Sequence, residues 1–376
     1  MTRAFIWSAC VTAIATLLAP PSVSAQQGEP IKIGAVVSLT GPGAGLGQPE
    51  RNGMLLAEKV INEKGGIKGR PIKVLIEDDG SKPDNAKSKA ERLIFDEKVS
   101  VLLGPSLTAS TGAVSAITNA EGMAELACTG LGPKIELTYK TLYHLLPPQL
   151  LNARAMLEYT TKVLKAKRLG VLHDTGYGQV VMNSLNSLTG AYEVEFVSVE
   201  KFEVGATDAS AQAAKVRAAD PEVLFIIATS PVPFRNAREV RITQPIVSAI
   251  GSSSYDYVRG MGEYADDIVF PEFVVGEDPA PHQTDFVKRY QQEYNALPKN
   301  YEAAGWDGVH IAAKAIETAG PNATRAEVAK AMRGSYSGTL ANYNFAADDM
   351  TGIELSSYVY SKLVKGHFTR LPFAAK

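Results

Sequence analysis

Hydroxyl-bearing side chains gather in a short segment that follows an apolar run. Residues 104–111 (GPSLTAST) come directly after the apolar residues 99–103 and before a helical pattern. Hydroxyl groups and the free backbone N–H groups at a helix start can both donate hydrogen bonds to an anion, and the helix dipole adds a favourable field. The segment therefore indicates a carboxylate site. Its candidate contacts are Leu107, Thr108, Ala109 and Ser110.

Two further segments share this placement between a strand pattern and a helix pattern. Residues 41–47 are rich in glycine, which lets backbone approach a ligand closely, and they include Leu46. Residues 174–178 (DTGYG) present Tyr177 between two glycines. Open α/β sheets bind ligands where strands lead into helices. Ordinary turns and helix caps explain each segment taken singly, but their joint placement favours a binding site.

Catalytic motifs are missing from the sequence. It contains neither the Gly-x-x-x-x-Gly-Lys-Ser/Thr phosphate loop nor a Gly-x-Ser-x-Gly nucleophile elbow, and its five histidines lack metal-ligand spacing. We therefore predict no catalytic residue, no metal and no cofactor. Cys128 lies at the end of an apolar run, where a free cysteine most often acts as a small buried hydrophobic residue.

Short apolar runs alternate with amphipathic segments along most of the chain, which predicts an α/β fold with parallel sheets. The predicted strands are 31–37, 72–76, 99–103, 124–128, 168–172, 194–199, 223–228, 246–250, 268–270 and 354–362. The predicted helices are 53–63, 83–98, 109–121, 152–165, one starting near 179, 208–219, 283–295, 302–319 and 325–332. No short internal repeat accompanies this pattern.

The first 25 residues have the features of a secretory signal peptide. Arg3 precedes an apolar run over residues 4–18, and Val23-Ser24-Ala25 forms a small-x-small cleavage site. The run is shorter than the roughly 20 residues that span a bilayer. We expect cleavage after Ala25 and export to the periplasm. The full chain of 376 residues, with a net charge of -2, favours two domains and does not suggest a nucleic-acid partner.

Four segments carry a resemblance to a known family. They are residues 31–86, 101–114 (VLLGPSLTASTGAV), 170–179 (GVLHDTGYGQ) and 303–320 (AAGWDGVHIAAKAIETAG). At these residues the chain resembles the branched-chain amino acid (Leu/Ile/Val) binding-protein family of ABC importers, which are type I periplasmic solute-binding proteins. The resemblance implies two Rossmann-like lobes joined by three hinge crossings, with the ligand in the cleft between them.

The resemblance also implies boundaries for the lobes. We expect lobe 1 to comprise residues 29–147 and 277–341, and lobe 2 to comprise residues 148–276 and 342–376. The crossings would then lie near residues 147–150, 275–278 and 338–345. A monomer that delivers its ligand to an ABC permease in the inner membrane is the assembly that the family implies.

Part of the family's binding site matches this sequence. The hydroxyl-rich carboxylate loop of the family matches Thr108-Ala109-Ser110, and the family's tyrosine in an Asp-x-x-Tyr-Gly loop matches Tyr177. A further Thr/Ala segment of the family falls at Thr129-Gly130-Leu131, with an alignment uncertain by one or two residues.

Two departures from the family pattern bear on the ligand. The family's amino-acid binders hold the α-ammonium group with an acidic residue after a lobe 2 strand, whereas residues 249–254 read AIGSSS here. A buried ammonium group without a carboxylate partner is costly. Leu46 replaces the family's aromatic residue, and the loop after the strand at 223–228 reads TSPVPF. The candidate contacts in lobe 2 are Ser230, Phe234, Ser252 and Ser253.

These departures predict a carboxylate ligand without an α-amino group. An aromatic acid is the first expectation, and a keto acid or short fatty acid is the second. Thr108 and Ser110 would capture the carboxylate, Tyr177 would pack on the ligand, and Leu46, Leu131 and Phe234 would form an apolar wall.

Two alternatives stay open at this point. The first is the same fold binding a branched-chain or other amino acid, with the carboxylate partner supplied by Asp256 or Glu272. The second is an exported α/β enzyme that uses Cys128 or a dispersed catalytic triad.

Overall fold

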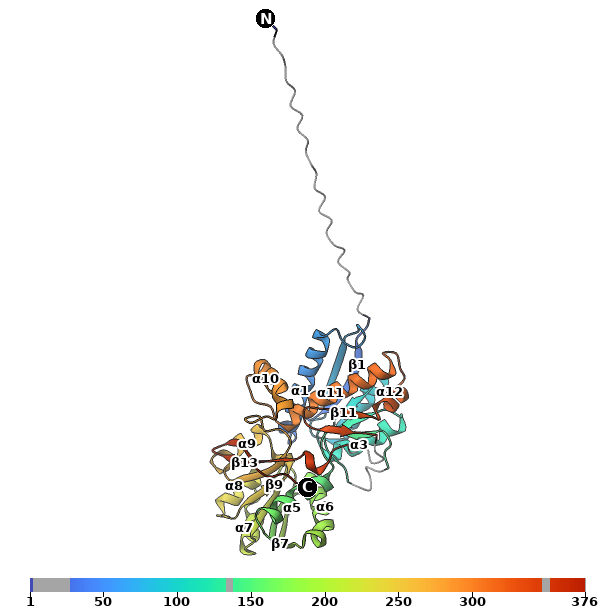
Figure 1. Cartoon of the computed structure of the whole chain (residues 1–376). Coiled ribbons are helices and arrows are strands. Elements are labelled where there is room, and N and C mark those ends of the chain that lie inside the picture. Colours follow the sequence, from blue (N-terminus) through green and yellow to red (C-terminus); the bar gives the residue numbers. More distant parts are fainter. Residues whose placement is uncertain (3–27, 133–137, 347–351, 376) are drawn as a thin grey trace.

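The structure is a computed structural model that describes residues 1–2, 28–132, 138–346 and 352–375. The predicted signal peptide lies almost entirely outside these residues, so its cleavage stays a prediction. The described chain forms two α/β bodies, one around β1, α1 and α11 and the other around α5, α7 and β9 (Figure 1). Within the described ranges, no helix combines the length and the apolar character that a membrane span requires.

The first sheet has five described strands in the order β2-β1-β3-β4-β5, all paired in parallel. They are β1 (Ile31–Val37), β2 (Ile72–Asp78), β3 (Leu102–Leu103), β4 (Glu125–Ala127) and β5 (Leu142–His144). The residues of β3, β4 and β5 are all buried, as expected for a parallel sheet that is covered on both faces.

Helices from both ends of the chain accompany this sheet. They are α1 (Ala44–Glu63), α2 (Pro83–Glu91), α3 (Thr108–Ala120), α10 (Thr284–Tyr294), α11 (Asn300–Ala319) and α12 (Arg325–Met332). The helix predicted over residues 83–98 ends in a π-helical turn, η1 (Arg92–Asp96). A two-stranded antiparallel ribbon, β11 (Ser335–Ser337) and β12 (Asn342–Asn344), follows α12.

The second sheet has seven described strands in the order β14-β13-β10-β9-β8-β6-β7. They are β6 (Arg168–Asp174), β7 (Glu195–Phe202), β8 (Val223–Ile227), β9 (Ile246–Ser248), β10 (Ile268–Glu272), β13 (Val359–Val364) and β14 (His367–Leu371). The accompanying helices are α5 (Gln149–Lys162), α6 (Tyr177–Tyr192), α7 (Ser210–Ala218), α8 (Val232–Glu239) and α9 (Tyr255–Met261). Four short 3₁₀ turns complete the elements: η2 (Ile250–Ser252), η3 (Gly262–Tyr264), η4 (Pro281–Gln283) and η5 (Leu355–Ser357).

The end of the chain departs from the predicted single strand over residues 354–362. It forms a 3₁₀ turn and then the antiparallel hairpin β13–β14, so the second sheet is mixed rather than wholly parallel. The hairpin turn is made by Lys365 and Gly366, both with positive φ, which is the conformation that tight two-residue hairpins require. Lysine is a weak sequence signal for a hairpin turn, which explains why the strand β14 after it was not predicted.

Two predicted loops are partly helical. The glycine-rich residues 41–47 were predicted as a loop, but α1 begins at Ala44 because close packing outweighs the low helix propensity of glycine. A Cβ atom on Gly47 would lie 2.2 Å from the carbonyl oxygen of Ser38. Residues 229–234 were also predicted as a loop, but α8 begins at Val232. Pro231 fixes a helical φ there, and the Ser230 hydroxyl accepts a hydrogen bond from the Val232 N–H at 3.2 Å.

The predicted α/β class is confirmed by these sheets. The lobe boundaries and the three crossings stay predictions. Lobe 1 denotes from here on the first sheet with its helices, and lobe 2 denotes the second sheet with its helices.

Candidate functional site

A small cavity lies where segments following the strands of both sheets meet. Its volume is about 10 Å³, room for roughly one water molecule. The lining residues are Leu46, Ser106, Leu107, Thr108, Cys128, Thr129, Tyr177, Thr229, Gly251 and Tyr301. Apart from Tyr301 on α11, they follow the carboxyl ends of β1, β3, β4, β6, β8 and β9, the edge where parallel α/β sheets bind ligands.

The lobe 1 side of the cavity presents hydroxyl groups. The Thr108 and Thr129 hydroxyl oxygens lie 3.4 Å apart. The side-chain amide of Gln149 donates to the Thr129 hydroxyl at 3.3 Å and to the Gly130 carbonyl at 3.4 Å. Because Gln149 already donates to Thr129, the Thr129 hydroxyl hydrogen is free to turn toward a ligand. Thr108 at the start of α3 and Thr129 after β4 therefore place two hydroxyl groups side by side at the cavity.

The opposite side of the cavity is aromatic, with Tyr177 from lobe 2 and Tyr301 from α11 of lobe 1. The Tyr177 hydroxyl accepts a hydrogen bond from the Gly251 N–H at 3.3 Å, and the Tyr301 hydroxyl donates to the Ile250 carbonyl at 3.4 Å. A Cβ atom on Gly251 would lie 2.6 Å from the Tyr177 ring. Glycine at this position is what allows the ring to lie flat against the backbone. Burial raises the pKa of Tyr177, so its hydroxyl stays protonated at neutral pH.

Five of the predicted site residues line this cavity: Leu46, Leu107, Thr108, Thr129 and Tyr177. Ser230 lines a neighbouring pocket instead. The other predicted residues line neither space: Ala109, Ser110, Gly130, Leu131, Phe234, Ser252 and Ser253.

The residues outside the cavity have other contacts or positions in the fold. Phe234 is fully buried in α8, within the core. Ser252 donates to the Ala228 carbonyl, and Ser253 donates to the Glu272 carboxylate at 2.6 Å. The Ser110 hydroxyl is buried without a hydrogen-bond partner in the described structure. These serines and Phe234 therefore support the walls of the cleft in this conformation.

Sequence reasoning missed five lining residues. They are Ser106, Cys128, Thr229, Gly251 and Tyr301. Ser106 and Cys128 directly precede predicted site residues, so a wider window around each strand end would have included them. Tyr301 lies almost 200 residues beyond Thr108 in the sequence, and only the fold brings α11 to this edge.

A buried carboxyl group lies directly behind the cavity. Glu50 of α1 is fully buried and accepts a hydrogen bond from the Ser106 hydroxyl, which itself accepts from the Ser38 N–H at 3.0 Å. Burial raises the pKa of Glu50 to about 8, and the nearby Asp79 carboxylate acts in the same direction. Glu50 is therefore mostly protonated at neutral pH and does not present a full negative charge to the cavity.

We predict that Glu50→Gln flattens the pH dependence of stability. The pKa of Glu50 is higher in the folded chain than in the unfolded chain, so folding takes up a proton between about pH 4.5 and 8. Stability from this group is present at low pH and is lost as pH rises toward 8. In wild type this group should lower the free energy of unfolding by up to about 1.4 kcal/mol per pH unit in this range, and the glutamine variant should lack this contribution.

Urea unfolding at pH 5, 6.5 and 8 measures this slope. Glu63→Gln, at an exposed position on the same helix, is the control and should keep the wild-type slope. Equal slopes for Glu50→Gln and wild type would refute the protonated state of Glu50.

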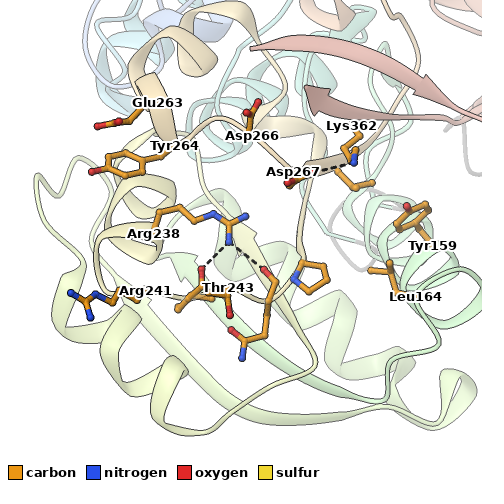
Figure 2. A pocket seen from close by; sticks show the side chains of 14 residues that line it. Tyr159, Leu164, Arg238, Arg241, Thr243, Glu263, Tyr264, Asp266, Asp267 and Lys362 are labelled. Carbon is orange, nitrogen blue, oxygen red and sulfur yellow. Dashed lines mark hydrogen bonds and ion pairs between the residues drawn. The ribbon is translucent and has the colours of Figure 1, made fainter. Parts of the chain in front are cut away.

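A larger cavity of about 840 Å³ lies elsewhere, on lobe 2 alone (Figure 2). Figure 2 shows Arg238 directed into it, with the guanidinium donating to the carbonyls of Ile242 and Gln244 at 2.8 and 3.3 Å. Lys362 pairs with Asp267 on another wall at 3.0 Å. None of the predicted site residues lines this cavity, and it lies where β9 and β10 begin rather than at their carboxyl ends. We therefore place the candidate binding site at the small cavity between the lobes, which we call the central cavity.

Cys128 is the nucleophile that the enzyme alternative would use at this cavity. Burial, followed by the neighbouring Glu50, raises the pKa of the Cys128 thiol, so the thiol stays protonated and is a poor nucleophile. Within the described ranges, no group of three or more His, Cys, Asp or Glu side chains is placed to hold a metal ion.

Comparison with known proteins identifies the class to which this architecture belongs. A family model described as periplasmic binding protein matches residues 30–354. The Leu/Ile/Val-binding protein homolog 3 of Brucella melitensis is 24% identical over 307 residues, covering 80% of this chain and 83% of the relative. An amino acid binding protein of Pseudomonas aeruginosa is 25% identical over 301 residues, covering 78% and 79%.

Solved structures give the same fold. The isoleucine complex of the branched-chain amino acid transporter substrate binding protein from Streptococcus pneumoniae superposes with a TM-score of 0.82 at 23% identity, covering 91% of this chain and all of the other. A benzoate complex of a solute binding protein of an ABC transporter from R. palustris gives a TM-score of 0.82 at 18% identity, covering 92% and 96%.

The chain therefore belongs to the periplasmic binding protein family. Within that family it is related to the Leu/Ile/Val-binding proteins of type I, which confirms the resemblance found in the sequence motifs.

Proposed function

We propose that this protein captures a small carboxylate without an α-amino group, an aromatic acid being the favoured ligand, for uptake by an ABC importer. The observation that carries the proposal is the make-up of the central cavity. Hydroxyl donors on lobe 1 face apolar and aromatic side chains, and no acidic side chain lines the described cavity. Such a surface suits an anionic head with an apolar body.

Asp174 and the two acids of the amino-acid alternative have other partners. Asp174 accepts hydrogen bonds from the Gly176, Gly178 and Thr229 backbone N–H groups at 2.7 to 3.0 Å. Glu272 pairs with Lys299 and Asp256 pairs with Arg259, so neither candidate of the amino-acid alternative lines the cavity. A ligand ammonium group would therefore enter the cleft without a free carboxylate partner, which is unfavourable.

Binding requires the cleft to change shape, because the cavity of about 10 Å³ is far smaller than a benzoate ring. We infer that the lobes open about the predicted crossings, admit the ligand, and close again on it. Since the ligand contacts Thr108 and Thr129 on lobe 1 and Tyr177 on lobe 2, it stabilises the closed form over the open form. The closed form would then dock on the permease as a monomer.

An α-amino acid is the second candidate ligand. The names of the relatives favour it, since they include Leu/Ile/Val-binding and amino acid binding proteins, and one structural neighbour holds isoleucine. The benzoate complex favours the aromatic acid. The enzyme alternative has the weakest support, because the Cys128 thiol is buried and protonated.

Thr108→Val is expected to weaken carboxylate binding by roughly 10- to 100-fold. The substitution keeps the side-chain shape and removes one hydroxyl donor, and a hydrogen bond to a charged group contributes about 1.5–3 kcal/mol. Isothermal titration calorimetry of benzoate against wild type and variant measures the change.

Thr318→Val, on an exposed part of α11, provides the matched control and should bind as wild type does. An affinity of Thr108→Val within twofold of wild type would remove Thr108 from the carboxylate site and count against the proposal.

A further inference from the structure

A second pocket adjoins the central cavity and opens on one side of the cleft. Its volume is about 310 Å³, and we call it the apolar annex. The lining residues are Pro42, Asp174, Phe202, Val204, Gly205, Ala206, Thr207, Thr229, Ser230, Pro231, Val232 and Tyr257. Most of these side chains are apolar, so the annex suits a hydrocarbon group better than a charged one.

A thin wall separates the annex from the central cavity. Thr229 lines both spaces. Tyr257 lines the annex and lies against Gly45, where a Cβ atom would be 2.7 Å from its ring. Gly45 is the chain neighbour of Leu46, which lines the central cavity. Thr229 is therefore the lining residue that the two spaces share, and Leu46 and Tyr257 lie on either side of Gly45 between them.

Both lobes contribute to the annex. Pro42 comes from lobe 1, and the other lining residues end or follow β6, β7 and β8 or belong to α8 and α9 in lobe 2. The Tyr257 hydroxyl donates to the Pro42 carbonyl at 3.3 Å. Gly205 also faces Pro42, since a Cβ atom on this glycine would lie 3.7 Å from the proline ring. A group filling the annex would thus contact both lobes and favour closure.

Two polar side chains of the annex, Asp174 and Ser230, accept hydrogen bonds from the backbone. Both carboxylate oxygens of Asp174 accept backbone hydrogen bonds, from Gly178 on one oxygen and Thr229 on the other. The Ser230 hydroxyl accepts from the Val232 N–H. Val204 leaves 43% of its surface exposed, so an apolar group bound in the annex would bury apolar surface there.

We infer that the ligand is an extended carboxylate, whose anionic head lies at Thr108 and Thr129 and whose apolar tail passes Leu46 to fill the annex. The inference rests on the proposed function and adds the length of the ligand to it. An aromatic acid carrying an alkyl substituent opposite the carboxylate is the simplest compound of this class.

The test compares benzoate with 4-propylbenzoate by calorimetry on the mature protein. The longer acid should bind roughly 10- to 60-fold more tightly, because each buried methylene contributes a factor of roughly four. In Ala206→Phe, where a ring occupies the annex, the ratio of the two affinities should fall toward one. Val204→Asp, at an exposed position, should lower the same ratio by placing a charge in the annex.

Ala120→Phe, at an exposed position on α3, makes the same substitution away from the cleft and should keep the wild-type ratio. Thermal unfolding of each variant verifies that it is folded. If wild type bound the two acids equally, the annex would not be the site of the apolar tail. The same would follow if both annex variants kept the wild-type ratio of the two affinities. Either result would leave carboxylate capture intact. Failure of both acids to bind wild type would contradict the proposed function and this inference with it.

Discussion

Lys299→Met is expected to lower the free energy of unfolding by roughly 3–5 kcal/mol, because it leaves a buried carboxylate without its cation. Lys299 and Glu272 form an ion pair with side-chain exposures of only 1% and 0%. Ser253 and Asn300 also donate to the Glu272 carboxylate, at 2.6 and 3.3 Å, and hold it in place. The ammonium lies 3.0 Å from the centre of the Phe368 ring, which adds a cation–π contact that methionine cannot make.

Urea unfolding at pH 7 measures this loss. Lys288→Met, at an exposed position on α10, should change stability by no more than about 0.5 kcal/mol. Adding Glu272→Gln to Lys299→Met removes the stranded charge and should restore most of the stability. A loss below about 1 kcal/mol in Lys299→Met would show that Glu272 is not an unpaired buried anion in that variant, contrary to the geometry.

Gly53→Ala should destabilise the fold by about 3 kcal/mol, at the upper end of the usual cost of overpacking. Gly53 of α1 and Gly305 of α11 let the two helix backbones touch. A Cβ atom on Gly53 would lie 1.9 Å from the Glu302 carbonyl oxygen, and one on Gly305 would lie 2.1 Å from that of Glu50. Since the obstacle is backbone, a side-chain rearrangement cannot relieve it.

This crossing also places two lining residues of the central cavity, because α1 carries Leu46 and α11 carries Tyr301. Gly53→Ala should therefore weaken ligand binding as well as stability. Gly190→Ala is the matched control: its Cβ would meet nothing within 4 Å in α6, and it should stabilise by up to about 1 kcal/mol. Thermal unfolding measures the stability of each variant, and benzoate titration measures its ligand affinity. Wild-type stability and affinity in Gly53→Ala would refute the close contact between α1 and α11.

The sequence predicted the α/β class and most strands because apolar runs and helical spacing are local signals. The strand over residues 31–37 and the helix over residues 325–332 have the predicted bounds. Local signals failed where long-range packing decides the conformation. The first turn of α1 contains glycines that favour a loop in isolation, and contacts with Ser38 and Tyr257 are what fix them in a helix.

The same distinction applies to the candidate site. Thr108 and Tyr177 could be chosen from the sequence because each follows a strand and matches a family motif. Ser252 and Ser253 could not be placed, because the direction of a serine side chain depends on acceptors far away in the sequence. These acceptors are the Ala228 carbonyl and the Glu272 carboxylate. Of the annex, only Ser230 was predicted as a site residue, since its walls combine Pro42 with residues more than 130 positions further along the chain.

The most direct test of the central claim is a thermal-shift comparison of two ligand panels on the protein without its predicted signal peptide. One panel contains aromatic and aliphatic carboxylates, and the other contains α-amino acids, including isoleucine and phenylalanine. A ligand at about 100 times its dissociation constant adds roughly 2.7 kcal/mol to the folded state. This corresponds to a rise of roughly 5–10 °C in melting temperature. We predict that rise for aromatic carboxylates and no rise for their α-amino counterparts. A rise confined to the amino acids would contradict a cleft that lacks an ammonium partner.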